Sequence, residues 1–81
     1  MGQLEKLLEK IRNNPKQVRF KELDRLLIRA GFSRRQPHGG SSHYTYTKGL
    51  TRITVPFHQP HVGEAYVKLV IKILEGEIND D

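Results

Sequence analysis

The amino-acid sequence predicts a small α+β domain in which helices cover one face of a three-stranded antiparallel sheet. Apolar residues recur with helical spacing before residue 31 and after residue 63, and they alternate with polar residues between residues 43 and 55. A turn signal, Lys48-Gly49, interrupts the alternating segment. Because the chain has only 81 residues, we expect one domain with the order helix, helix, strand, strand, strand, helix.

Two apolar stripes predict the helices in the first part of the chain. The first stripe comprises Leu4, Leu7, Leu8 and Ile11, and the second comprises Phe20, Leu23, Leu26, Leu27 and Ala30. Pro15 is expected to end the first helix, because a proline disfavours helical geometry at the preceding residue. Gly31 can cap the second helix in the left-handed conformation. Residues 1–19 are therefore expected to add an N-terminal helix to a core formed by residues 20–76.

Strand-type alternation and a third stripe predict the remaining elements. The expected strands are residues 32–36, which Pro37 stops, residues 43–47 and residues 50–55. The last helix is expected over residues 64–74, where Val67, Val70, Ile71 and Leu74 share one face. We expect Gly76 to end this helix and residues 77–81 to form a frayed acidic tail.

Basic charge is concentrated in the middle of the chain. Residues 12–52 carry ten lysines and arginines against two acids, whereas residues 53–81 have a net charge of −3. This asymmetry suggests a polyanionic partner, with nucleic acid ahead of a membrane, but a surface that is kept soluble by its like charge explains it equally well. No cysteine is present, which excludes disulfides, cysteine-zinc sites and thiol catalysis. Without a signal-peptide segment or a membrane-length apolar run, the expected location is the cytoplasm and no membrane contact is expected.

The candidate chemistry lies around His43, which follows the small run Gly39-Gly40-Ser41-Ser42. Glycine allows close backbone approach to a ligand, and serine hydroxyls and backbone amides can bind phosphate oxygens. The cations expected nearby are Arg34, Arg35, Lys48 and Arg52. An imidazole among phosphate-binding groups suits RNA cleavage, in which it takes the proton of a 2′-hydroxyl that attacks the adjacent phosphate. This route requires no metal and no other cofactor.

Each of these features also has a simpler interpretation. His43 can be an ordinary surface residue, and the run before it can be plain loop composition. His58 and His61 have a spacing that suits metal ligands, but no further ligands are evident. Tyr44 and Tyr46 share a strand face and can stack on bases, although packing in the core is the more common role. Arg34 and Arg35 must point to opposite faces of their strand.

Several motifs occur in the order that one bacterial family shows. They are Leu27-Ile28-Arg29-Ala30-Gly31-Phe32, Arg34-Arg35-Gln36, Gly40-Ser41-Ser42-His43 followed by Tyr44, and Ile53-Thr54-Val55-Pro56 with His58, before a closing helix. In this order they resemble the HicA toxin family of small bacterial mRNA endoribonucleases. The resemblance runs from Phe20 to the end of the chain.

The resemblance implies a fold similar to double-stranded-RNA-binding domains and a catalytic role for His43. It also implies a metal-independent ribonuclease of a toxin–antitoxin system, which cuts mRNA and is neutralised by a HicB-like antitoxin. Residues 1–19 depart from the family pattern and could complete the core, contact an antitoxin or support self-association. Glu64 departs as well, because a basic or neutral residue is usual there.

Two questions stay open at the level of sequence. The general acid that protonates the leaving group could be His38, His58, Tyr44, Lys48 or solvent. The alternative function is a non-catalytic RNA-binding module of the same fold, in which His43 contacts a phosphate or a 2′-hydroxyl.

Overall fold

The computed structural model describes residues 2–35, 43–57 and 60–79. Its elements are α1 (Gln3–Asn13), α2 (Phe20–Arg29), β1 (Ser33–Arg35), β2 (His43–Lys48), β3 (Thr51–Pro56) and α3 (Glu64–Asn79). The predicted α+β class and the predicted order of elements are therefore confirmed. Pro15 stands two residues after the end of α1, as expected from its effect on the preceding residue.

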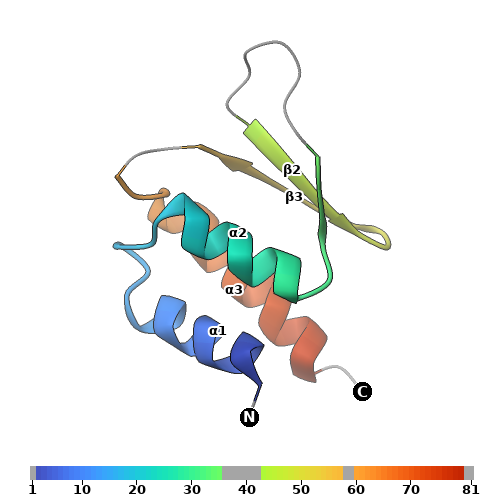
Figure 1. Ribbon diagram of the computed structural model, residues 1–81, viewed down its shortest axis with the longest axis horizontal. Helices are drawn as coiled ribbons and strands as arrows, with labels where there is room; N and C mark the ends of the chain where they lie inside the picture. The colour runs from blue at the N-terminus through green and yellow to red at the C-terminus, as the bar shows by residue number, and fades with distance from the viewer. Residues whose placement is uncertain (1, 36–42, 58–59, 80–81) are drawn as a thin grey trace.

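The sheet has the strand order β1-β2-β3, and both strand pairs are antiparallel. Tyr46 on the central strand pairs with Arg34 on β1 and with Ile53 on β3. Residues that are directly paired across neighbouring strands point to the same side, so these three residues share one face of the sheet. Tyr46 and Ile53 are buried on that face. Figure 1 shows all three helices on one side of the sheet, with α1 farthest from it.

Helix α2 ends in the glycine cap that the sequence predicts. Gly31 has a φ of +100°, and its amide donates to the Ile28 carbonyl at 3.1 Å. The amide of Phe32 donates to the Leu27 carbonyl at 3.0 Å, and both side chains are buried. These two hydrogen bonds form a Schellman motif, which stops the helix and turns the chain into β1.

The hairpin between β2 and β3 depends on a second glycine. Lys48 pairs with Thr51, so Gly49 and Leu50 form a two-residue loop. Gly49 has a φ of +60°, whereas no other residue type in the described part has a positive φ. A positive φ at only the first loop position is typical of a type II′ turn, whose twist matches that of the two strands.

The prediction that Gly76 ends the last helix is wrong, because α3 continues to Asn79. A glycine inside a helix costs only about 1 kcal/mol relative to alanine. The buried stripe that ends at Leu74 lies just before this position and fixes the helix against the core. The helical hydrogen bonds therefore extend past Gly76, into part of the segment that was expected to fray.

Helix α1 is part of the hydrophobic core. Leu8 and Ile11 are buried in the same cluster as residues of α2, the sheet and α3. The Lys10 ammonium pairs with the Glu22 carboxylate at 3.1 Å, and Arg12 pairs with Glu75 on α3. Residues 1–19 were expected to complete the core, contact a partner or support self-association. These contacts support the first of the three roles.

Candidate nucleic-acid interface

The face of the sheet turned away from the helices is polar and basic. We call it the open sheet face, and its polar residues are Ser33, Arg35, His43, Thr45, Thr47, Arg52 and Thr54, with the buried Pro56 opposite His43 at its end. The register groups these side chains in rows, because Arg35 pairs with Thr45, which pairs in turn with Thr54. The next row is formed by Ser33, Thr47 and Arg52, and His43 lies at the beginning of β2. Two arginines on the edge strands thus flank the threonines of the central strand.

The electrostatic character of the open sheet face follows from its side chains. It carries two guanidinium groups, one imidazole and four hydroxyl groups, and no carboxylate among its described residues. Arg35, His43 and Arg52 are exposed to solvent. Guanidinium and hydroxyl groups donate hydrogen bonds to phosphate oxygens, and a guanidinium can donate two at once. The face therefore suits a sugar–phosphate backbone better than a cation or an apolar ligand.

Arg34 lies on the opposite face of the sheet, next to the helices. Its guanidinium donates to the Asp24 carboxylate of α2 at 2.9 Å and lies 5.9 Å from the centre of the Tyr44 ring. The hydrogen bond to Asp24 raises the pKa of Arg34 above its usual value. The prediction that Arg34 and Arg35 point to opposite faces is confirmed, and only Arg35 shares a face with His43.

Lys48 lies at the junction of the hairpin and α2. Its ammonium donates to the Ala30 carbonyl at 2.7 Å and lies 5.8 Å from the centre of the Phe32 ring. A cation at this position stabilises the negative end of the α2 dipole. Of the four cations predicted near His43, the structure therefore brings Arg35 and Arg52 onto its face and gives Arg34 and Lys48 contacts with α2.

Tyr46 is fully buried beneath the sheet, and its hydroxyl donates to Asp24 at 2.7 Å. Tyr44 is half-buried on the same face, with its ring centre 4.9 Å from that of Phe20. Packing in the core is therefore confirmed for Tyr46. Asp24, which the sequence did not single out, joins α2 to β1 through Arg34 and to β2 through Tyr46.

Burial, reinforced by the hydrogen bond to Asp24, raises the pKa of Tyr46 above its usual value of about 10. A raised pKa in the folded state means that folding favours the protonated phenol. This contribution to stability is complete below pH 10 and is lost as the pH rises above the pKa of the unfolded chain.

We expect Tyr46→Phe to lower the free energy of unfolding by about 1.5–3 kcal/mol at pH 8, because a hydrogen bond to a charged group is lost. Between pH 8 and pH 11 the difference should shrink by about 1.4 kcal/mol, since only the wild-type chain has this phenol to ionise on unfolding. Urea unfolding of both proteins at several pH values measures this difference. A constant difference up to pH 11 would contradict the coupling.

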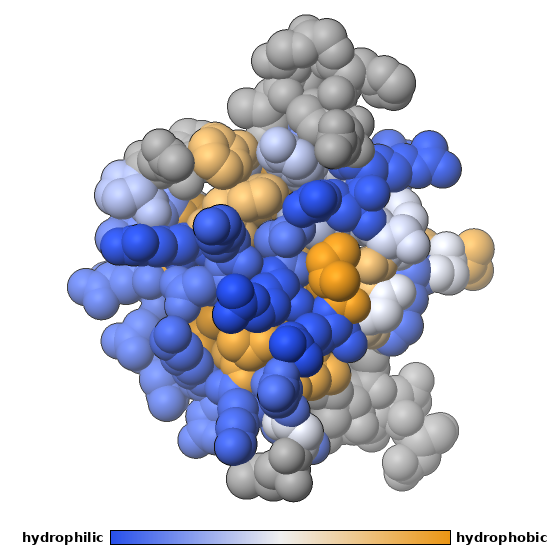
Figure 2. Space-filling view, in the orientation of Figure 1, coloured by the Kyte–Doolittle hydropathy of each residue, from blue (hydrophilic) through white to orange (hydrophobic). Residues whose placement is uncertain are grey.

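A second group of cations lies on the outer surface of α2. Lys21, Arg25 and Arg29 line a shallow depression together with Asp24 and Ile28. Figure 2 shows hydrophilic side chains over most of this side of the molecule, around a smaller hydrophobic area. These cations are on the helical side and are separate from the open sheet face. Substitutions of Arg25 and Arg29 are therefore matched controls for substitutions of Arg35 and Arg52.

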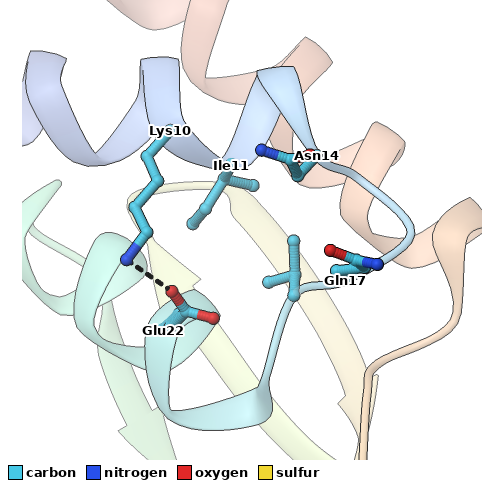
Figure 3. Close-up of a pocket in the computed structure, with 6 residues that line it drawn as sticks. Lys10, Ile11, Asn14, Gln17 and Glu22 are labelled. Atoms are coloured by element: carbon cyan, nitrogen blue, oxygen red, sulfur yellow. Dashed lines mark ion pairs between the residues drawn. The ribbon is translucent and has the colours of Figure 1, made fainter.

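A small pocket lies between the end of α1 and the beginning of α2 (Figure 3). It is lined by Lys10, Ile11, Asn14, Gln17, Val18 and Glu22. The Glu22 carboxylate accepts a hydrogen bond from the Arg19 amide at 3.1 Å, which lowers the pKa of Glu22. Because the charges of Lys10 and Glu22 pair with each other, this pocket offers less to an anionic ligand than the open sheet face.

Several predicted residues lie outside the described residues: His38, Gly40, Ser41, Ser42 and His58. His61 is described and is half-buried. Among residues 2–35, 43–57 and 60–79, no group of three or more histidines and acids is placed to hold a metal ion. Glu64 forms an ion pair with Lys68 on its own helix at 3.1 Å.

No family model, curated protein or solved structure matches the chain. Across the described part of the chain, no helix has the length and apolar character needed to span a bilayer. The chemistry available to the protein therefore lies in the open sheet face and in the motif around His43.

Proposed function

We propose that the protein is a small endoribonuclease that binds RNA on the open sheet face, with His43 as its general base. The observation that carries the proposal is the placement of His43, Arg35 and Arg52 on one exposed face with four hydroxyl groups. This combination matches the needs of RNA cleavage, which are a proton acceptor and donors for phosphate oxygens.

The proposed reaction uses the 2′-hydroxyl of the RNA as its nucleophile. His43 takes the 2′-proton, the 2′-oxygen attacks the adjacent phosphorus, and the bond to the 5′-oxygen of the next nucleotide breaks. The products are a 2′,3′-cyclic phosphate and, after protonation of the leaving oxygen, a 5′-hydroxyl. Arg35, which the register places two residues along from His43, stabilises the negative charge that spreads over the phosphate oxygens, and Arg52, four residues along, binds the RNA backbone farther along the sheet.

Two of the candidate general acids lie away from the open sheet face. Tyr44 shares the helical face with Tyr46, and Lys48 donates to the Ala30 carbonyl, so both are on the wrong side of the sheet for a phosphate at His43. His38, His58 and solvent remain as proton donors. The proposed route uses no metal, because the 2′-hydroxyl is the nucleophile and His43 is the base.

The wider proposal rests on the sequence resemblance. The fold is a variant of the double-stranded-RNA-binding domain with an extra N-terminal helix, and the protein is a HicA-like toxin. It acts on mRNA in the cytoplasm and is neutralised by a HicB-like antitoxin. The alternative is a non-catalytic RNA-binding module, which the absence of an assigned general acid among the described residues favours.

The decisive experiment incubates purified protein with a long single-stranded RNA in excess EDTA and maps the new ends. We expect cleavage in EDTA with 2′,3′-cyclic phosphate and 5′-hydroxyl ends. Binding without cleavage would favour the RNA-binding module. Cleavage that EDTA abolishes and zinc restores would refute the metal-free route and would make His58 and His61 candidate ligands.

The place of RNA binding can be tested by salt titration. Removing two phosphate contacts should reduce the slope of log K against log salt by about 1.4 in magnitude for single-stranded RNA. We expect this reduction for the double variant Arg35→Gln/Arg52→Gln. The matched control, Arg25→Gln/Arg29→Gln, loses the same charge from α2 and should retain most of the wild-type slope. Equal losses in the two variants would show that binding is not confined to the open sheet face.

A further inference from the structure

Phe57 is an exposed aromatic residue at the end of the sheet that carries His43. It follows β3 directly, and the last residue of β3, Pro56, pairs with His43. Its side chain remains 42% exposed, although it is large and apolar. Other exposed apolar side chains, such as Leu50 and Leu69, lie in the β2–β3 turn and on α3. Phe57 therefore lies at the end of the sheet that carries His43, with its ring beside Tyr44 on the helical side of that end.

The ring of Phe57 is held in place by two other aromatic rings. Its centre is 5.0 Å from that of Phe20 in an edge-on contact at 63°, and 6.4 Å from that of Tyr44. Phe20 is buried, so it provides a fixed support. Edge-on packing is a favourable arrangement of aromatic rings, and it leaves part of the Phe57 surface open to solvent. The cationic Arg34 is beside Tyr44 in this cluster.

A supported aromatic ring with an open surface is what proteins use to bind unpaired bases. Each base has a π-face, so stacking tolerates any sequence. A base inside a duplex is already stacked, and it must be unstacked at a cost before it can reach such a ring. An aromatic platform next to a phosphate site therefore favours single-stranded RNA.

We infer that Phe57 is a stacking platform for an unpaired nucleobase adjacent to the phosphate held at His43. The inference rests on the proposed function, because it names the form of RNA that the same site takes. In it, Arg35 and Arg52 bind the backbone on the open sheet face, and the base reaches around the end of β3 to Phe57. The site then selects single strands by stacking and not by reading base edges.

Affinity measurements can isolate the stacking contribution. With a single-stranded oligonucleotide of 2′-O-methyl riboses, which cannot be cleaved, Phe57→Ala should weaken binding about 5- to 150-fold. Phe57→Tyr keeps the ring and should bind like the wild type. With an oligonucleotide that lacks its bases, the wild type and Phe57→Ala should bind equally. Leu69→Ala, which removes an exposed apolar side chain from α3, is the control for loss of surface area.

A fluorescence experiment tests the location directly. The chain contains no tryptophan, so Phe57→Trp introduces a single reporter. We expect its emission to be quenched by single-stranded RNA and much less by a duplex. Leu50→Trp is the control, because Leu50 lies in the turn at the opposite end of β2 and β3 (Figure 1). Its emission should change little with either RNA.

The outcomes separate this inference from the proposed function. If the wild type binds the base-containing strand and Phe57→Ala binds it equally well, the stacking platform is refuted and the RNA site stands. If Phe57→Ala weakens binding equally with and without bases, the residue acts on the fold or the backbone, and the inference is also refuted. If the wild type binds no RNA, the proposed function fails and the inference fails with it. Circular dichroism of each variant verifies that it is folded.

Discussion

Replacing His43 with alanine should reduce the rate of RNA cleavage by about 10²–10⁴-fold, which is the usual contribution of a positioned general base. Without the imidazole, the 2′-hydroxyl has no side-chain acceptor for its proton on the open sheet face. Hydroxyl groups and guanidinium groups cannot replace it near neutral pH. Initial rates on a defined single-stranded RNA, measured in EDTA, give the effect directly.

The fold should survive this substitution, because His43 is exposed at the first position of β2. His61→Ala provides a matched control, since it removes a histidine that lies outside the open sheet face. This control should cleave RNA at the wild-type rate. If His43→Ala cleaves like the wild type and has an unchanged circular dichroism spectrum, His43 is not the base. If neither the wild type nor His43→Ala cleaves and both bind RNA, His43 is a contact in a binding module.

The elements that local sequence determines were predicted well. The stripes of α1 and α2 have helical spacing, and Pro15 and Gly31 end the two helices for reasons that involve only their neighbours. The hairpin between β2 and β3 could also be predicted from local sequence, because the Lys48-Gly49 turn signal coincides with its turn. The end of α3 was predicted wrongly, because a helix that is anchored by its apolar stripe tolerates the small energetic penalty of Gly76.

The residues of the candidate site were predicted only in part, because the sequence does not give the register between β1 and β2. The alternation of side chains along a strand places Arg34 and Arg35 on opposite faces of the sheet. The pairing of Arg34 with Tyr46 then decides which of the two arginines faces the helices. Residues 36–42 separate these strands, so no short turn reveals that pairing. The contacts of Arg34 with Asp24 and of Lys48 with Ala30 join residues 10 and 18 positions apart, which local patterns do not indicate.

Two functional residues were missed, and the sequence carried a hint of only one of them, Asp24. Asp24 is one of only two acids among the basic residues 12–52, which hints that it pairs with something specific. Its partners, Arg34 and Tyr46, become evident only when β1 and β2 are placed over α2. Phe57 is an apolar residue beyond the end of a strand, and its partial exposure could not be read from the sequence.

The contribution of α1 to the fold should be large. Ile11 is 2% exposed in the common core. We expect Ile11→Ala to lower the free energy of unfolding by about 2–5 kcal/mol, from lost burial and from the cavity that remains. Since a small domain has a total stability of about 5–15 kcal/mol, this is a substantial fraction. Urea unfolding followed by circular dichroism measures it.

Ile11→Ala also tests whether α1 is a part of the core or a helix that is merely appended to it. Leu50→Ala truncates a fully exposed side chain in the β2–β3 turn and should change stability by no more than about 0.5 kcal/mol. If Ile11→Ala behaves like this control, α1 is peripheral and the rest of the chain folds without it. If its effect is large, the whole domain should lose stability in one transition, because Ile11 belongs to the single core cluster that includes the sheet and α3. Under conditions where Ile11→Ala is folded, its RNA cleavage should match the wild type, since α1 lies on the side of the helices that is farthest from the sheet.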